Sequence, residues 1–480
     1  MYKHRLLAFA VALSVLPHAG YAATDDDLKE LREQVRQLKD SYEKRIEALE
    51  KRLQQAEQSA GKAEAAATQA QGTATQAQGT ANQAAVQASS RPSGASAFNP
   101  GISLILSGTW GNLSRDPARY RIDGFAPTGG EVAPPGRGLN LGESEIVMSA
   151  NVDQHFRGTL IAALAPDNSV GVEEGYLQTI GLSGGLSVKA GRFYSGIGYQ
   201  NEIHKHAWDF VDAPLASKAF LGNQLSDDGV QVKWVAPTDL YFDVGAEAGR
   251  GRKFPSGPDG GRSKNGAGSG TLFAHLGGDI GASTAWRVGL SRLQTSPQDR
   301  TYTDLDSTGT SVTNSFTGHS RLWVFDGVLK WAPNGNATQT SFKLQGEYFR
   351  RSEEGNLTYD STAASLGTQT GRYASKQSGY YVQGVYQFRP QWRAGYRYDR
   401  LDSGAASLGL VSTGARSAAD FPILSRYNPT RNTFMVDWSP SEFSRLRLQF
   451  ARDRSQFAAT DNQVFLQYIM SLGAHGAHKF

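Results

Sequence analysis

The 480-residue sequence contains no cysteine, which excludes disulfide bonds and thiolate chemistry. It has no apolar run of the roughly 20 residues that a transmembrane helix needs. It also lacks a nucleophile elbow, a phosphate-binding loop and a zinc-protease helix motif, so we expect no enzyme, although an active site assembled across strands would leave no such motif. A formal net charge of only +4, with no concentrated basic face, argues against a nucleic-acid partner.

The N-terminus has the pattern of a secretory signal peptide. Lys3 and Arg5 precede the apolar stretch Leu6–Leu16, and small residues follow at Gly20 and Ala22. This stretch is too short to cross a bilayer, so we predict cleavage after Ala22 and exclude residues 1–22 from the fold.

Residues 23–60 are predicted to form an α-helical coiled coil in the periplasm. Apolar residues recur at steps of three and four, with one stutter, and charged residues flank them. The seam consists of Leu28, Leu31, Val35, Leu38, Tyr42, Ile46, Leu49 and Leu53. One such helix cannot bury its seam alone, so we predict self-association, with a homotrimer as the natural guess if the rest of the chain forms a pore.

Residues 61–99 are rich in Ala, Gln and Thr, and the heptad TQAQGTA occurs at 68–74 and again at 75–81. Alanine continues the heptad seam through this stretch, which favours a narrow coil. Gly72 and Gly79 favour a flexible linker instead, so both readings stay open.

From residue 100 onward the hydrophobic period changes to two, which indicates strands with one apolar and one polar face. Leu446, Leu448 and Phe450 alternate with Arg445, Arg447 and Gln449. A mean hydropathy of −0.44 does not exclude a membrane protein, because a barrel hides apolar residues at every second position.

Three features favour a transmembrane barrel over a soluble sandwich. Tight turns, such as those at 183–185, 236–238 and 389–391, alternate with long polar segments near 251–270, 296–318, 353–372 and 402–428. Tryptophans cluster beside the short turns, as in an interfacial girdle. The chain also ends in Phe480, which resembles the terminal aromatic signal of outer-membrane proteins.

Sixteen alternating runs are found between residues 102 and 472. The predicted fold is therefore mostly β: residues 100–480 form an antiparallel transmembrane β-barrel of about 16 strands in the bacterial outer membrane, preceded by the coiled coil. Barrels of this size leave an aqueous channel.

The order of signal peptide, coiled coil and barrel resembles the layout of the coiled-coil porins, such as the sucrose porin and the DcaP-type channels. The segment VKAGRF at 188–193 resembles a strand of the phosphate-selective porins. The end of the chain, LGAHGAHKF at 472–480, is similar to that of uncharacterised outer-membrane proteins described as zinc-regulated receptors.

The long segment 195–226 is rich in aromatic and charged residues, so we predict that it folds inward as the constriction of the pore; the alternative is an outer loop that only stabilises the barrel. We expect eight strand residues to line the lumen: Lys189, Lys233, Lys343, Glu347, Arg393, Arg397, Arg445 and Arg447. Basic groups dominate this set and predict a mild preference for anions. Alternatively, they pair with carboxylates such as Asp399 and Asp453 and merely fill the barrel.

Histidines occur in two pairs that could bind a divalent metal such as zinc, although no cofactor is required by the predicted function. His204 and His206 lie near Glu202 and Asp209, and His475 and His478 lie near the C-terminus. The alternative is that these are ordinary surface histidines that lie beside carboxylates without binding a metal.

These patterns predict a porin for small polar or anionic solutes, with the lipid bilayer and lipopolysaccharide as surroundings. Two alternatives are a barrel that takes up zinc or another divalent metal, and a structural tether in which the coil reaches the cell wall, with peptidoglycan as a possible partner.

Overall fold

The computed structural model describes residues 100–129, 132–165, 167–257 and 266–473, together with scattered residues between 29 and 55. The chain divides into two units, residues 1–97 and 98–480. In the first unit, the described residues are helical and exposed, and Arg36 pairs with Glu33 at 3.9 Å. Helix is therefore confirmed at these positions. The signal peptide and residues 61–99 lie outside the described residues, and the coiled-coil association stays a prediction.

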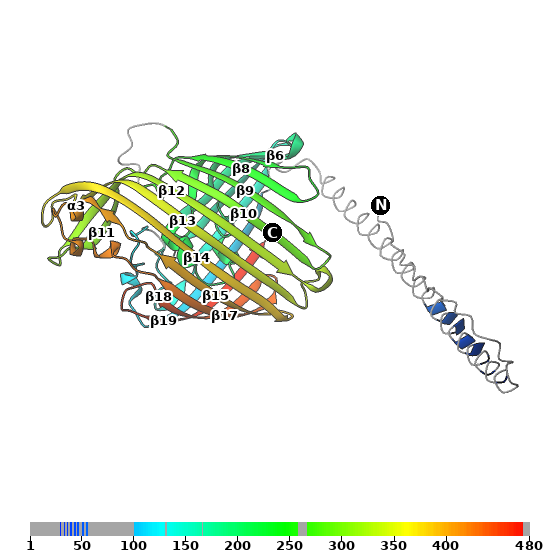
Figure 1. Cartoon of the computed structure of the whole chain (residues 1–480). Coiled ribbons are helices and arrows are strands. Elements are labelled where there is room, and N and C mark those ends of the chain that lie inside the picture. The colour runs from blue at the N-terminus through cyan, green and yellow to red at the C-terminus, as the bar shows by residue number, and fades with distance from the viewer. Residues whose placement is uncertain are drawn as a thin grey trace, which may run out of the picture. The chain divides into compact units, whose positions relative to one another are not determined.

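The second unit is a closed barrel in which all paired strands are antiparallel (Figure 1). Within the described residues, sixteen strands form the wall of the barrel, and we call them its staves. They are β1 (Gly101–Leu113), β3 (Ser144–Asn151), β4 (Phe156–Leu164), β5 (Val170–Thr179), β6 (Leu186–Tyr194), β7 (Ser226–Val235), β8 (Tyr241–Gly249), β9 (Ser269–Ile280), β10 (Thr284–Thr295), β12 (Ser311–Trp331), β13 (Ser341–Tyr359), β14 (Gln369–Arg389), β15 (Trp392–Asp402), β17 (Thr430–Ser441), β18 (Ser444–Arg454) and β19 (Asp461–Gly473). Pairing of β1 with β19, for example Trp110 opposite Leu466, closes the barrel. The predicted fold class and strand number are confirmed.

Three short strands extend staves rather than adding new ones. β2 (Gly138–Leu141) pairs with β1 beyond β3, β11 (Arg300–Leu305) pairs with β12 beyond β10, and β16 (Ser407–Leu408) pairs with β14 beyond β15. β2 precedes β3, whereas β11 and β16 follow β10 and β15, and a short break separates each from its stave. The number of staves around the barrel therefore stays even.

The two faces of each strand differ as the period of two predicts. On β18, Leu448 is 55% exposed and Phe450 is 44% exposed, whereas Arg447 and Gln449 between them are buried. A soluble protein would bury the apolar set instead. The polar faces therefore point into the barrel and the apolar faces cover its outside, as a membrane requires.

The short predicted turns all lie at one end of the barrel, between successive strands. Tryptophans mark this end, and Trp392 stacks on Trp438 with ring centroids 6.0 Å apart. The chain's predicted aromatic girdle is thus built where strands meet their short turns. The terminal Phe480 lies outside the described residues.

Two predicted loops are largely strand. Residues 296–318 and 353–372 contribute to β11 and to the long strands β12, β13 and β14, which have 21, 19 and 21 residues and extend toward β11 and α3 (Gly409–Ser412) in Figure 1. The prediction of loops was wrong here because these strand extensions carry polar residues on their outward face and bury apolar ones, such as Val312, Phe316 and Tyr359, inside. They therefore lack the outward apolar alternation of a membrane strand.

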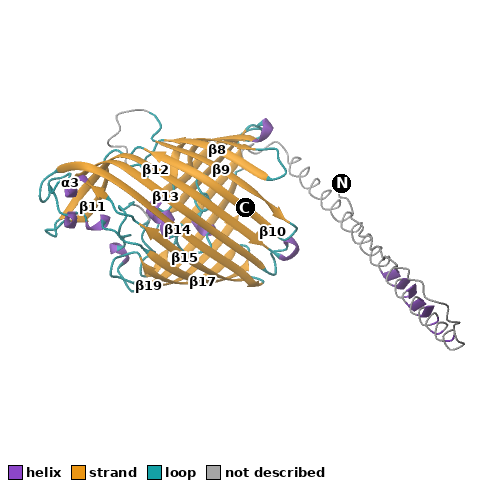
Figure 2. Ribbon diagram, in the orientation of Figure 1, coloured by secondary structure: helices purple, strands orange, loops and turns teal. Residues whose placement is uncertain are grey.

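The helices of the second unit are short and lie in loops and turns, as Figure 2 shows. Besides α3 they are η1 (Pro117–Arg119), η2 (Ser183–Gly185), η3 (Lys205–Ala207), α2 (Leu215–Leu221), η5 (Pro333–Gly335), η6 (Ala418–Asp420) and η7 (Pro422–Leu424). In the described part of the chain, no helix has both the length and the apolar character for a membrane span.

Candidate functional site

The segment 195–225 leaves β6 and is bound by side chains that point into the barrel. Its first residues are held by two glutamates. The backbone N–H of Gly196 donates to Glu247 Oε1 on β8 at 2.8 Å, and the N–H of Tyr199 donates to Glu347 Oε1 on β13 at 2.5 Å. Between these two contacts the N–H of Gly198 donates to Ser291 on β10, so residues 196–199 follow the wall from β8 to β13. The segment then crosses the interior, because His204 contacts Glu174 on β5.

Gly198 is required where the segment meets Glu347. Its φ is +70°, a conformation that L-residues rarely adopt, and a Cβ atom there would collide with Glu347 Oε1. Its N–H donates to Ser291 Oγ at 3.2 Å. Glycine therefore permits both the turn and the close approach.

The next part of the segment is basic and faces an acidic wall. His204 Nε2 lies 2.9 Å from Glu174 Oε2 on β5, and His206 Nδ1 lies 3.0 Å from Glu145 Oε1 on β3. Between them, Lys205 pairs with Glu143, which lies directly before β3.

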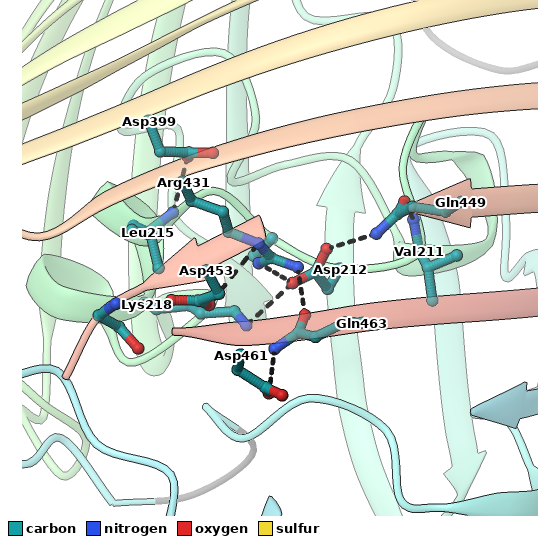
Figure 3. A network of polar contacts seen from close by, with 12 residues as sticks. Val211, Asp212, Leu215, Lys218, Asp399, Arg431, Gln449, Asp453, Asp461 and Gln463 are labelled. Atoms are coloured by element: carbon teal, nitrogen blue, oxygen red, sulfur yellow. Dashed lines mark hydrogen bonds and ion pairs between the residues drawn. The ribbon is translucent and has the colours of Figure 1, made fainter. Parts of the chain in front are cut away.

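The last part is acidic and faces a basic wall. Asp209 accepts from Lys343 at 2.9 Å and from Arg393 at 3.1 Å, on β13 and β15. Asp212 then accepts from three cations around it, of which two are on strands and one is on α2. These cations are Arg397, Arg431 and Lys218. Figure 3 shows Arg431 and Lys218 beside Asp212.

Burial alone would raise the pKa of Asp212, but the guanidinium groups and Lys218 hold it well below the ordinary value of 3.8. The pKa of Asp209 is likewise lowered, against its burial, by Lys343 and Arg393. Burial lowers the pKa of His204, yet three surrounding glutamates outweigh it and raise this pKa well above 6.5. The loop therefore holds charges of both signs.

The segment ends in α2, which packs inside the barrel. Gly222 terminates this helix at φ +65°. Phe220 stacks on Phe349 of β13, and Phe125 from the loop after β1 packs edge-on against it. Leu215 is fully buried, and its N–H donates to Asp399 at 2.9 Å. Apolar packing thus completes the attachment that the ion pairs begin.

The residues predicted to line the lumen are mostly paired. Six of them lie within 4.0 Å of a carboxylate oxygen: Lys233, Lys343, Arg393, Arg397, Arg445 and Arg447. Lys189 lies over the rings of Tyr176 and Phe193, and Glu347 accepts from the loop backbone. These contacts match the alternative in which the charged side chains pair with one another and fill the barrel. They do not support the predicted preference for anions, which stays a prediction.

Of the predicted metal-binding residues, His204 and His206 lie 5.8 Å apart as stacked rings. Asp209 does not join them because Lys343 and Arg393 bind it. His475 and His478 lie outside the described residues. Instead, His204 meets Glu145 and Glu173, and within the described residues these three could hold a metal ion.

Sequence reasoning did not identify the acidic wall or Arg431. Glu145 lies on β3 and Glu143 directly before it, and the single residue between them places both side chains on the inward side. That alternation was a usable signal, but their contacts with the loop, 61 and 62 residues away in sequence, were not predictable from spacing.

Space remains beside the loop on its acidic side. One cavity of about 560 Å³ is lined by Glu143, Glu173, Lys205 and Gln224, among others. A second cavity of about 450 Å³ is also lined by Glu143 and Lys205, together with His206, Trp208 and Asp212. The Lys205–Glu143 ion pair therefore borders both spaces.

No family model matches the chain. A protein of Aquifex aeolicus (strain VF5), described as uncharacterized, is 29% identical in an alignment of 429 residues that covers 81% of this chain and 81% of that one. Similar solved structures include the anion-selective porin of Comamonas acidovorans, at 10% identity and a TM-score of 0.46 over 78% of this chain and 99% of that one. The outer-membrane channel DcaP of Acinetobacter baumannii is 13% identical, with a TM-score of 0.42 over 78% of this chain and 97% of that one.

Proposed function

We propose that this chain is a porin of the bacterial outer membrane, through which small polar or anionic solutes diffuse, and that segment 195–226 forms its constriction. The observation that carries the proposal is a barrel that is apolar outside and polar inside, crossed by a loop that leaves cavities along one wall. Sixteen staves give a lumen wide enough for water and small solutes unless a loop narrows it.

The narrowest point in this proposal is the Lys205–Glu143 ion pair. It borders both cavities, so a solute that moves from one to the other passes it. The opposite wall is excluded as a path because Arg397, Arg431 and Arg447 fill it and are at most 1% exposed.

The test is single-channel conductance and reversal potential of the purified mature chain in planar bilayers. Lys205→Ala removes a long side chain and a positive charge, so conductance should rise by about 1.5- to 2-fold and selectivity should shift toward cations. Lys376→Ala is the matched control, because Lys376 is exposed on the outer face of β14. If the unaltered chain gave no channel current in planar bilayers, the proposal of a porin would be rejected and a structural tether would be favoured.

The same proposal includes a homotrimer joined through the periplasmic coiled coil, surrounded by lipid and lipopolysaccharide. The helical residues between 29 and 55 support the coil, and the exposed apolar strand faces support the lipid contact. Sedimentation in mild detergent should give three chains per particle; a monomer would contradict this assembly. Contact of the coil with peptidoglycan is a separate proposal that a pull-down with cell-wall fragments would test.

A further inference from the structure

Three potential metal ligands converge where the loop meets the acidic wall. His204 Nδ1 lies 3.3 Å from Glu145 Oε2 on β3 and 3.3 Å from Glu173 Oε2 on β5. All three atoms lie within 4.8 Å of one another. Three separate elements thus each place one ligand atom at a common point.

These atoms are buried and lack hydrogen bonds. The Glu145 side chain is completely buried, and those of Glu173 and His204 are 12% and 15% exposed. Among the described residues, none provides a hydrogen bond to Glu145 Oε2, Glu173 Oε2 or His204 Nδ1. Buried carboxylate oxygens that face only an imidazole nitrogen at 3.3 Å are satisfied either by a proton on that nitrogen or by a cation shared by all three atoms.

The surrounding contacts fix the orientation of these ligands. Glu174 lies 2.9 Å from His204 Nε2 and accepts from the Tyr194 N–H at 3.0 Å. The Glu174 carboxylate accepts a hydrogen bond from Nε2–H, which keeps the ring proton on Nε2 and leaves the lone pair of Nδ1 directed at Glu145 and Glu173. His206 Nδ1 binds the other oxygen of Glu145 at 3.0 Å. Outer carboxylate partners of this kind orient histidine ligands in metal sites.

We propose that Glu145, Glu173 and His204 bind a divalent transition-metal ion of the zinc class. One imidazole and two carboxylates form a zinc ligand set with a fourth position for water, whereas calcium and magnesium prefer all-oxygen sites. Ligands about 2.0–2.1 Å from a tetrahedral ion are themselves roughly 3.3–3.4 Å apart, which matches the two distances at His204. Glu173 also lines the 560 Å³ cavity, so the ion can enter from it.

The ion would tie the loop to β3 and β5 and add a fixed positive charge beside the cavity. This binding site does not depend on conduction, so it can be tested on protein in detergent. The competing explanation is a metal-free cluster in which a doubly protonated His204 pairs with the carboxylates.

The test is calorimetric titration of the folded, full-length mature chain with ZnCl₂ at pH 7.5. A background carrying His475→Ala and His478→Ala removes the C-terminal histidines from the measurement. We expect one saturable site per chain in this background, and at least 100-fold weaker binding after His204→Ala. The matched control is His155→Ala, because His155 is exposed at a short turn.

Glu173→Gln is a second variant that keeps the side-chain size, and it should also weaken zinc binding at least 100-fold if His204→Ala fails to fold. Far-UV circular dichroism checks that each variant is folded. Absence of saturable binding in the background chain would overturn the site. Binding that survives both His204→Ala and Glu173→Gln would overturn it equally.

Discussion

The two walls that face the loop differ in charge and in packing. The wall of β13, β15, β17 and β18 is basic and tightly filled, and it binds the loop's acidic residues Asp209 and Asp212. The wall near β3 and β5 is acidic, retains cavities, and binds the basic residues 204–206. The loop is therefore oriented by complementary charge: the basic wall anchors it, and the acidic wall retains cavities beside it.

Removing Asp212 should break the anchored side most severely. Asp212→Ala leaves Arg397, Arg431 and Lys218 buried without their shared carboxylate. Loss of one partner from such a buried cluster costs about 3–5 kcal/mol. Denaturant unfolding should show this loss, with Asp279→Ala at the exposed end of β9 as control. Equal stability of the two variants would show that the anchor has no energetic role.

A charge exchange sharpens the comparison on the open side. Lys205→Glu and Glu143→Lys each place like charges together, whereas the double variant restores an ion pair of reversed polarity. We expect a coupling of about 0.5–3 kcal/mol between the two positions in a double-mutant cycle of unfolding. Additive effects of the two changes would mean that the pair does not hold the loop.

Replacing Gly198 tests the close approach of the loop to Glu347 on β13. Gly198→Ala adds backbone strain at φ +70° and a clash with Glu347, whereas Gly281→Ala at φ +63° adds strain in open space. Strain of this kind costs about 1–3 kcal/mol. The unfolding free energy should fall further for Gly198→Ala than for Gly281→Ala. An equal fall would indicate that the approach to Glu347 is not tight.

The smallest effect concerns pH on the anchored side. Because the pKa of Asp212 is lowered in the folded chain, its contribution is complete above its unfolded value near 3.8 and declines only as the pH falls below it. The difference in unfolding free energy between the unaltered chain and Asp212→Asn should therefore stay constant from pH 8 to 5. A difference that already shrinks between pH 7 and 5 would contradict the assigned ion pairs.

The period of two in the sequence was enough to predict the barrel, since membrane strands expose apolar residues on alternate positions. The same rule failed at 296–318 and 353–372, where strands continue into water, their outward face becomes polar, and their apolar residues turn inward. Strand boundaries on this side of the barrel depend on pairing with neighbours, such as Ser315 with Thr358, that sequence periodicity does not record.

The site was predictable only in part. The length and composition of 195–226 marked it as a segment that folds into the barrel, and His204 was identified from its charged neighbours. Its true partners, Glu145 and Glu173, come from strands that only the closed barrel brings together. Asp209 was assigned to the metal-binding residues because its distance from Lys343 in the sequence does not reveal that the two side chains form an ion pair.

Cysteine-scanning conductance tests the central claim, a constriction at Lys205, most directly, because the chain has no cysteine of its own. A charged thiosulfonate reagent would be applied to Lys205→Cys channels in a planar bilayer, with Lys376→Cys as control. We predict a stepwise fall in single-channel current for Lys205→Cys and none for Lys376→Cys. Complete modification of Lys205→Cys, verified by mass spectrometry, with unchanged current would contradict the constriction.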